Sequence, residues 1–350
     1  MQQHTILSRA GLLALPGVCT FLLMLMLVPM PLLSQDIHWS QFQYSPLNLG
    51  PSQTGNYTGD YRFAANHRRQ WKSVTEPYRT FSGSFDMPVN IMPDARQRFS
   101  AGLLFNNDKA GDSKLGTTQF ALSLAAMQSI DKDSIHFIGL GIQLGYVMRS
   151  IDYSALTFDE QYDGDFFNPS LGKSENFDGE NHGYFDVGAG LHWMMKTAGR
   201  FSLGAGFSVA HLNKPDDSFF DEGVKVNPRM QTSIQADFGI APKLDLVPAL
   251  LLMNQGAFKE LTGGTSVRFR ISEKPGRNYA LSVGGWIRSK DAMIASAGLD
   301  YNLLRIGVSY DFNTSDLDRA SNGKGGYELS LIYIIRKVKS TGIKPPCPLY

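Results

Sequence analysis

Residues 138–149 read IGLGIQLGYVMR, and large apolar residues occupy every second position of this stretch. The apolar residues are Ile138, Leu140, Ile142, Leu144, Tyr146 and Met148. Because side chains of an extended chain point alternately to two faces, the stretch predicts a β-strand with one apolar face and one face of small or polar residues. Its glycines lack the GxGxxG spacing of a dinucleotide loop and no helix follows, so we interpret them as packing residues.

The same alternation recurs along the chain, for example in 201–210, 278–287 and 327–336. Strands of globular proteins average about 5–6 residues, whereas tilted strands that cross a membrane need about 9–11. Most segments here keep the pattern for about ten residues or more, and aromatic residues stand near their ends, as in membrane barrels. These aromatic residues are Tyr61, Tyr146, Tyr184, Tyr310 and Tyr327. The sequence therefore predicts an all-β protein, a transmembrane β-barrel of the outer membrane.

We expect about fourteen antiparallel strands, and an even number lets both ends of the chain lie in the periplasm. The expected strands lie near 57–67, 77–87, 97–106, 117–127, 135–149, 183–196, 200–212, 228–240, 243–253, 260–271, 277–288, 291–301, 303–313 and 325–337. Connections after odd-numbered strands should then be extracellular and long. The longest expected connections, 150–182, 213–227 and 314–324, all follow odd-numbered strands.

The first 34 residues have the pattern of a cleaved signal peptide for export to the outer membrane: Arg9, an apolar run and a small residue, Ser34. The alternative, a membrane anchor, is disfavoured by the prolines around the run and by the lack of a basic flank. Cleavage would leave Cys347 as the one cysteine of the mature chain, which excludes an internal disulfide and a cysteine-based zinc site. A net charge of +1 argues against a nucleic-acid partner, and nothing in the sequence indicates a cofactor.

Residues 35–55 precede the first expected strand and show no period. Trp39, Phe42 and Tyr44 lie in this segment, which is too short to fold alone, so its aromatic side chains need a surface to bury against. We expect them to anchor the segment against the lumen or the periplasmic rim. The barrel is expected over 56–338, and a periplasmic tail over 339–350.

The connection 150–182 is the most acidic region of the chain and also carries aromatic residues. We expect it to be an extracellular loop that binds a partner, and we single out Phe158, Asp159, Glu160, Asp163, Asp165, Phe166 and Phe167. Calcium binding is the alternative, although the twelve-residue order of an EF-hand is absent and we expect no metal site.

Other polar residues on the lumen face have two interpretations. Arg62, Arg68, Arg268, Arg270 and Arg305 are expected to point inward together with Asp86, Asp237, Asp300 and Asp311. They can form an ion-pair network that holds the barrel's shape or line a selective passage, and composition does not separate the two. His192 and Asp186 share the inward face of one strand, but no serine, histidine and acid are placed together, so we expect no catalytic residues and no enzyme.

Several short motifs resemble the PorP/SprF family, outer-membrane proteins of the type IX secretion system of Bacteroidetes. They begin with QDIHWSQF at 35–42 and continue with NYTGDYR at 56–62 and NHRRQW at 66–71. Further matches are GYVMRSID at 145–152, FDEQY at 158–162, HLNKP at 211–215 and the terminal CP at 347–348. The resemblance thus runs along the whole mature chain. One departure is GPS at 50–52, where the family usually has Asn-Pro-Ala.

This resemblance implies a role in secretion and surface attachment. Family members are partners of the type IX machinery, some with its periplasmic ring components. Many serve one large adhesin-like substrate with a C-terminal sorting domain, and gliding motility can depend on them. The partners implied are therefore such a secreted protein, the machinery and outer-membrane lipid. The alternative function is a channel or transporter for small hydrophobic or polar solutes, favoured by the small-residue lumen and by an N-terminal segment able to plug it.

Overall fold

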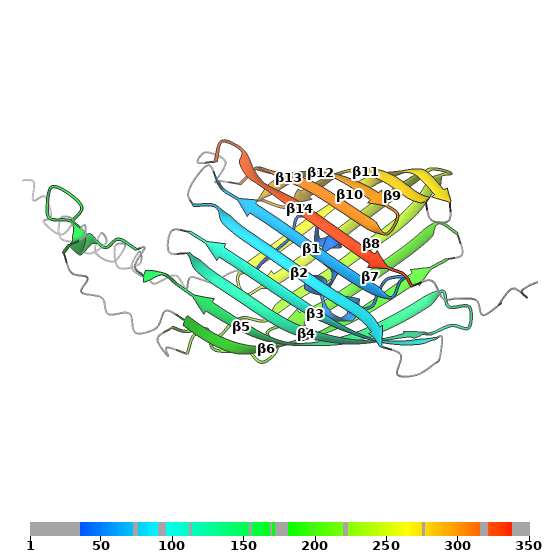
Figure 1. Ribbon diagram of the computed structural model, residues 1–350, viewed down its shortest axis with the longest axis horizontal. Helices are drawn as coiled ribbons and strands as arrows, with labels where there is room; N and C mark the ends of the chain where they lie inside the picture. The colour runs from blue at the N-terminus through cyan, green and yellow to red at the C-terminus, as the bar shows by residue number, and fades with distance from the viewer. Residues whose placement is uncertain are drawn as a thin grey trace, which may run out of the picture. The chain divides into compact units, whose positions relative to one another are not determined.

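The computed structural model describes residues 36–72, 76–89, 96–111, 114–153, 156–168, 170–171, 181–197, 199–219, 223–274, 277–315 and 321–337. The expected signal peptide and C-terminal tail lie outside these residues. The strands are β1 (Tyr61–Gln70), β2 (Tyr78–Val89), β3 (Gln97–Ala110), β4 (Leu115–Ser129), β5 (His136–Ser150), β6 (Asn181–Lys196), β7 (Phe201–Ala210), β8 (Arg229–Ala241), β9 (Leu244–Gln255), β10 (Phe258–Lys274), β11 (Arg277–Arg288), β12 (Ala292–Tyr301), β13 (Leu304–Asn313) and β14 (Lys324–Ile335) (Figure 1). The short helices are η1 (Phe42–Tyr44), α2 (Pro46–Leu49), η2 (Pro51–Gln53) and η4 (Asp159–Gln161).

The fourteen strands close into one antiparallel barrel. Each strand pairs with its sequence neighbours, and β1 pairs with β14, with Tyr61 opposite Ile335. Closure gives each of the described strands a hydrogen-bonded neighbour on both sides, which is what a sheet in lipid requires. The predicted fold class and strand number are therefore confirmed. Among the described residues, no helix is long and apolar enough to cross a membrane.

The first strand begins at Tyr61, later than the sequence pattern predicted. The Asp60 amide still donates to the Ile335 carbonyl of β14 over 2.8 Å, but the backbone before it is bound by side chains. The Arg98 guanidinium donates to the Tyr57 carbonyl over 2.8 Å, and the Arg336 guanidinium donates to the Thr58 carbonyl over 3.3 Å. These two contacts lie where the sequence pattern predicted the start of the strand.

The apolar face of β5 points out of the barrel, toward the position of the lipid. The six residues named above for 138–149 are between 39% and 60% exposed. On the opposite face, Gly141 allows the N-terminal chain to approach closely, because a Cβ atom there would lie 2.4 Å from Pro51 C and Ser52 N. One aromatic residue was misplaced: Tyr184 shares its face of β6 with Asp186, which is buried in the lumen, and so does not belong to an outward girdle.

The two ends of the barrel are identified by its connections. The first residue of β1, Tyr61, lies opposite the last residue of β14, Ile335, so the chain enters and leaves the barrel at the same end. In a barrel with an even number of strands this end is periplasmic. The connections at this end include the two-residue turns 242–243 and 302–303. The longest connection, 151–180, lies at the extracellular end between β5 and β6.

Candidate functional site

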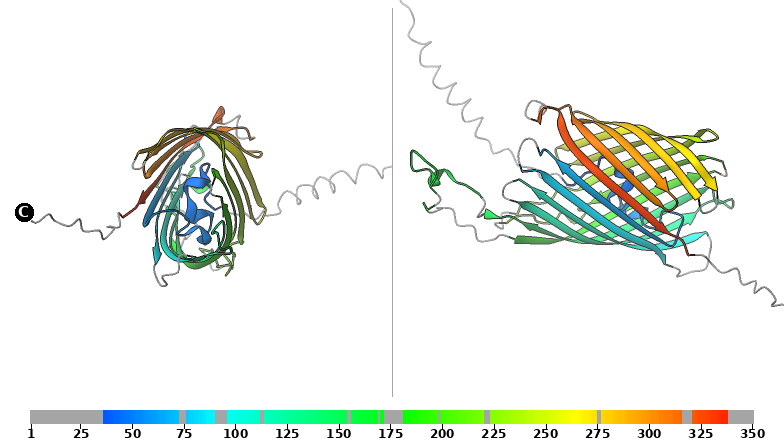
Figure 2. Two further views of the ribbon diagram at one scale, coloured as in Figure 1. Left: turned by 90° about the vertical axis from the view of Figure 1, so that its right-hand side faces the viewer. Right: turned by 45° about the horizontal axis from the view of Figure 1, so that its top comes forward.

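Residues 36–57, called the lumenal segment below, run through the inside of the barrel (Figure 2). At the extracellular end, Asp36 meets the ends of β7, β8 and β9. Its carboxylate accepts a 2.7 Å hydrogen bond from His211 Nε2 and pairs with the Arg229 guanidinium at 3.1 Å. At the periplasmic end, the Gly55 amide donates to the Asp86 carboxylate over 2.6 Å. The segment thus spans the lumen from one end to the other before β1 begins.

Two of the three expected aromatic anchors are buried in a small apolar core inside the lumen. Trp39 is 3% exposed and Phe42 is 2% exposed. They pack with Leu251, Trp286 and Ile294 of the barrel wall, and the Phe42 and Trp286 rings meet edge to face with 6.1 Å between centroids. Aromatic pairs of this geometry add about 0.5–1.5 kcal/mol beyond the burial of their area.

Tyr44, the third expected anchor, is only partly buried. It lies beside two glycines of neighbouring strands, Gly298 and Gly307. A Cβ atom at Gly298 would lie 3.0 Å from the Tyr44 hydroxyl, and one at Gly307 would lie 2.9 Å from its ring. The two glycines therefore provide the space into which this side chain fits.

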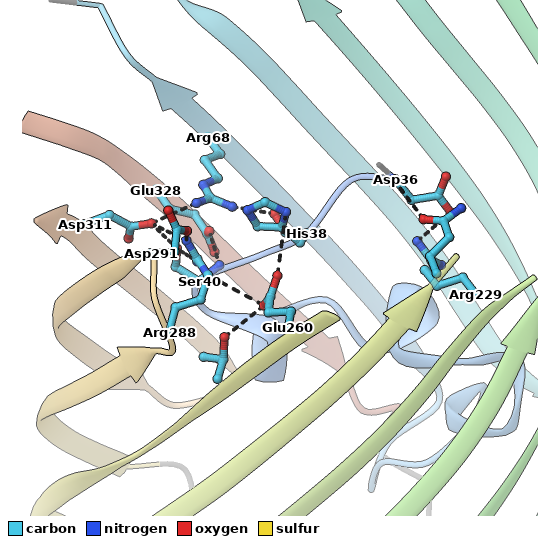
Figure 3. A network of polar contacts seen from close by, with 12 residues as sticks. Asp36, His38, Ser40, Arg68, Arg229, Glu260, Arg288, Asp291, Asp311 and Glu328 are labelled. Atoms are coloured by element: carbon cyan, nitrogen blue, oxygen red, sulfur yellow. Dashed lines mark hydrogen bonds and ion pairs between the residues drawn. The ribbon is translucent and has the colours of Figure 1, made fainter. Parts of the chain in front are cut away.

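A cluster of buried charges holds the segment near the extracellular end (Figure 3). We call this cluster the outer clamp, and it consists of Arg68, Glu260, Arg288, Asp311 and Glu328. The Glu328 carboxylate accepts the backbone N–H groups of Ser40 and Gln41 over 2.8 and 3.0 Å. Because both backbone groups are buried in the lumen, the carboxylate replaces the partners that water would otherwise supply.

The outer clamp also binds the segment through arginine. The Arg68 guanidinium donates to the His38 carbonyl over 2.7 Å and to Asp311 over 2.8 Å. The Arg288 guanidinium donates to the Ser40 hydroxyl over 2.7 Å. Two guanidinium groups thus face three carboxylates of the strands, and they also bind the segment through the His38 carbonyl and the Ser40 hydroxyl.

The middle of the segment is satisfied by polar side chains of the wall. Ser208 and Gln231 donate to the Leu49 carbonyl over 2.8 and 3.1 Å. Asn48 donates to the Ser82 hydroxyl over 2.8 Å. At the periplasmic end, the Arg62 guanidinium forms two 2.8 Å hydrogen bonds with the Asp86 carboxylate and a 2.9 Å bond with the Gln53 carbonyl. The segment is therefore bound along its whole length.

His211 and Asp36 form an ionic contact at the extracellular end, outside the strands. His211 lies between two carboxylates, with Asp186 2.8 Å from its Nδ1 atom. Burial by itself would lower the pKa of His211, but the charges and hydrogen bonds of Asp36 and Asp186 raise it to about 9. Burial would raise the pKa of Asp36, but Arg229 and His211 lower it well below its ordinary value. Both groups are therefore charged at neutral pH.

The lumen-facing pair His192 and Asp186 is not brought together in the way a catalytic pair requires. Asp186 binds His211, and His192 Nε2 lies 3.4 Å from the Asn56 side-chain amide. Among the described residues, no group of three or more His, Cys, Asp or Glu side chains is placed to hold a metal ion.

The predicted partner-binding residues are all described and lie in the stretch 156–168. Asp159 and Glu160 are exposed and stand in η4, and Phe158 precedes them. The Asp163 carboxylate accepts the backbone N–H groups of Phe166 and Asp165, which lower its pKa. Phe166 is 75% exposed and Phe167 is 51% exposed. The stretch thus exposes aromatic side chains beside carboxylates. One of these carboxylates, that of Asp163, stabilises the turn within the stretch.

Sequence reasoning did not single out Glu260, Arg288, Glu328 or His211. Alternation places Glu328 on the inward face, opposite the outward Tyr327, so a signal was present. The sequence does not show how far along the barrel axis each of these residues lies, because this height depends on the stagger between strands.

The chain was compared with known protein families. The model of the family described as type IX secretion system membrane protein PorP/SprF matches residues 32–333. The chain belongs to this family. Membership in the PorP/SprF family confirms the resemblance seen in the sequence, and together with the barrel it places the protein in the outer membrane as a component of the type IX secretion system.

No curated protein matches the chain. Among solved structures, the Ralstonia pickettii toluene transporter TbuX is similar over 82% of this chain and 92% of its own, with 9% identity and a TM-score of 0.48. The CymD monoaromatic hydrocarbon channel is similar over 84% and 93%, with 8% identity and a TM-score of 0.47. A Pseudomonas aeruginosa FadL homologue is similar over 78% and 88%, with 9% identity and a TM-score of 0.41. At these values the likeness says nothing of what this PorP/SprF protein binds.

Proposed function

We propose that the protein is a non-catalytic member of the type IX secretion system that binds a large, adhesin-like secreted protein with a C-terminal sorting domain. It supports the export of this protein or its attachment at the cell surface, and gliding motility that uses the attached protein depends on the barrel. Contacts with the periplasmic ring components of the machinery belong to the same proposal. The observation that carries it is the filled lumen, because the lumenal segment is bound at both ends and leaves the barrel's outer surfaces for partners.

The extracellular stretch 156–168 supports a protein partner. Groups of exposed apolar side chains mark interaction sites, and aromatic residues supply much of the binding energy in protein interfaces. Tyr162, Phe166 and Phe167 are all more than half exposed, and Asp159 and Glu160 stand near them. A partner with apolar pockets and basic residues at its rim would complement this surface.

The proposal is tested in cells that carry the gene. Deleting it should move the secreted protein from the cell surface to the medium or leave it inside the cell, as measured by quantitative mass spectrometry of the three fractions. A deletion strain that keeps the secreted protein attached in normal amounts would refute the proposal.

A double substitution narrows the test to the loop. Phe166→Ser with Phe167→Ser should reduce the amount of secreted protein that co-purifies with the tagged barrel, by about tenfold or more if the rings are central to the interface. Val224→Ser is the matched control, because Val224 is 54% exposed in a different extracellular connection. Equal co-purification by both variants would place the binding surface elsewhere.

A second candidate function is passage of small solutes, favoured by a cavity of about 640 Å³ between the lumenal segment and the periplasmic mouth. Such a volume is within the range of about 300–1,000 Å³ common for small-molecule sites. Solute flux into liposomes that contain the wild-type protein would support this candidate. Absence of flux, combined with co-purification of a secreted protein, would favour the first.

A further inference from the structure

The cavity at the periplasmic mouth is lined in part by positively charged side chains that are not paired with carboxylates of the described residues. We call it the vestibule. Its floor is the lumenal segment, and its rim includes Arg98, Lys196 and Arg336, whose side chains are exposed. Because exposed rim side chains line it, the vestibule opens to the periplasm.

The carboxylates of the vestibule are already paired with arginines. Asp300 accepts from Arg305 over 2.9 Å, and Asp237 accepts from Arg268 over 3.0 Å. Arg62 is likewise occupied by Asp86, at 2.8 Å. Among the described residues that line the vestibule, Asp237 and Asp300 are the only carboxylates, and both are paired.

Three exposed cations of the rim are held differently from these pairs. Arg98 donates to the carbonyls of Gly55 and Tyr57, and Arg336 donates to the Thr58 carbonyl. Within the described part of the chain, none of Arg98, Lys196 and Arg336 lies within 4.0 Å of a carboxylate oxygen. Carbonyls accept hydrogen bonds without neutralising charge, so these three described side chains present positive charge at the rim.

The wall of the vestibule also carries apolar side chains. Phe137, Met194 and Leu303 line the same cavity. A free phosphate or another small anion would use only the cations, whereas a polypeptide can place carboxylates on the rim and apolar side chains inside. The chain's own last residues do not fit, because 338–350 contain Lys339 and Lys344 and no Asp or Glu.

We propose that the vestibule is a docking site for an acidic, extended polypeptide segment of another protein, presented from the periplasm. The segment's carboxylates pair with Lys196 and Arg336 at the rim, and its apolar side chains lie against the wall. This docking site extends the periplasmic contacts of the proposed function, and it lies on the opposite side of the membrane from the extracellular loop, so the two surfaces are tested separately.

The test uses the full-length protein in nanodiscs, where both sides are accessible. Binding of a short fluorescein-labelled peptide of alternating Glu and Leu is followed by fluorescence anisotropy, with a peptide of alternating Lys and Leu as comparison. We expect the acidic peptide alone to bind, with affinity that falls as salt is raised. Lys196→Glu with Arg336→Glu should weaken it about tenfold, since each reversal turns an attraction into a repulsion.

The matched control is Lys109→Glu, an exposed lysine at the extracellular end of β3, which should leave binding unchanged. Retained folding is checked for each variant by the heat-dependent mobility of the barrel on gels. Three results would overturn the proposal: no binding of the acidic peptide, equal binding by the double variant, or full displacement by inorganic phosphate at the same concentration of charge. The last result would assign the vestibule to small anions.

Discussion

At the scale of the residue, Glu328 connects the barrel wall with the lumenal segment. One carboxylate accepts two buried backbone N–H groups, from Ser40 and Gln41, and stands in a cluster with two arginines. Hydrogen bonds to charged groups contribute about 1.5–3 kcal/mol, and a buried donor that loses its partner costs a similar amount. We therefore expect Glu328 to be one of the strongest single attachments of the segment.

The first prediction concerns Glu328→Gln. The amide keeps one acceptor but turns a donor toward one of the two N–H groups, so we expect a loss of about 2–3 kcal/mol in the binding of the segment. Chymotrypsin, which cuts after aromatic residues, should then cleave near Trp39 or Phe42 faster than in the wild type. Glu273→Gln is the control, because the Glu273 side chain is 46% exposed, and it should change the rate little. Equal protection of both variants would contradict the role given to the outer clamp.

The second prediction is a pH dependence set by His211. Its pKa is raised from an ordinary 6.5 to about 9, so its contribution to stability is fully present below about pH 6.5 and is lost as the pH rises through about 9. The contribution is on the order of 3 kcal/mol. Chymotrypsin cleavage of the lumenal segment should therefore accelerate above pH 9.

His211→Asn is the variant for this test, because asparagine tolerates the left-handed backbone of this position, where φ is 57°. The variant should be cleaved more readily at neutral pH and should lack the rise between pH 7 and about pH 10. A wild-type profile that is flat over this range would show that the ionic contact does not hold the segment.

At the scale of the element, alternation of small and large residues in each strand builds a wall with two different faces. In β5 the outward face is apolar, and the inward glycines give the lumenal segment room to approach. A glycine within a strand is usually unfavourable by roughly 0.5–1 kcal/mol relative to alanine. Position 141 is therefore best filled by glycine because η2 packs directly against the backbone there.

The third prediction compares two glycines. Gly141→Ala places a Cβ atom 2.4 Å from the backbone of Pro51 and Ser52, so the segment or the strand must shift, at a cost of about 1–3 kcal/mol. Gly285→Ala meets no atom within 4 Å and should be neutral or slightly stabilising. Thermal unfolding of both variants in detergent measures the difference. Equal melting temperatures would mean that η2 does not pack against β5 in this way.

The strands could be predicted from the sequence because each carries its own period. The lumenal segment could not be placed in the same way, because 36–57 has no period and its partners are far away in the chain. The bond between Ser40 and Glu328, for example, joins residues 288 positions apart. Which wall residues meet at one level depends on the stagger of fourteen strands, and no single strand encodes it. The family, in contrast, was recognisable from short motifs along the chain.

At the scale of the whole molecule, the barrel is a closed wall with an occupied lumen, an acidic and aromatic stretch outside, and a basic vestibule toward the periplasm. This arrangement suits a protein that is held between partners on two sides of the membrane more than one that conducts solutes. Both the proposed function and the proposed docking site start from the observation that the chain itself fills the lumen.

Ion conductance across a planar lipid bilayer tests this central claim most directly. The wild-type protein should be closed, whereas a variant that lacks residues 36–54 should form open channels, because the barrel strands begin only at Tyr61. The heat-dependent mobility of both proteins on gels verifies that each barrel is folded. A wild-type conductance equal to that of the shortened variant would contradict a lumen closed by its own N-terminal segment.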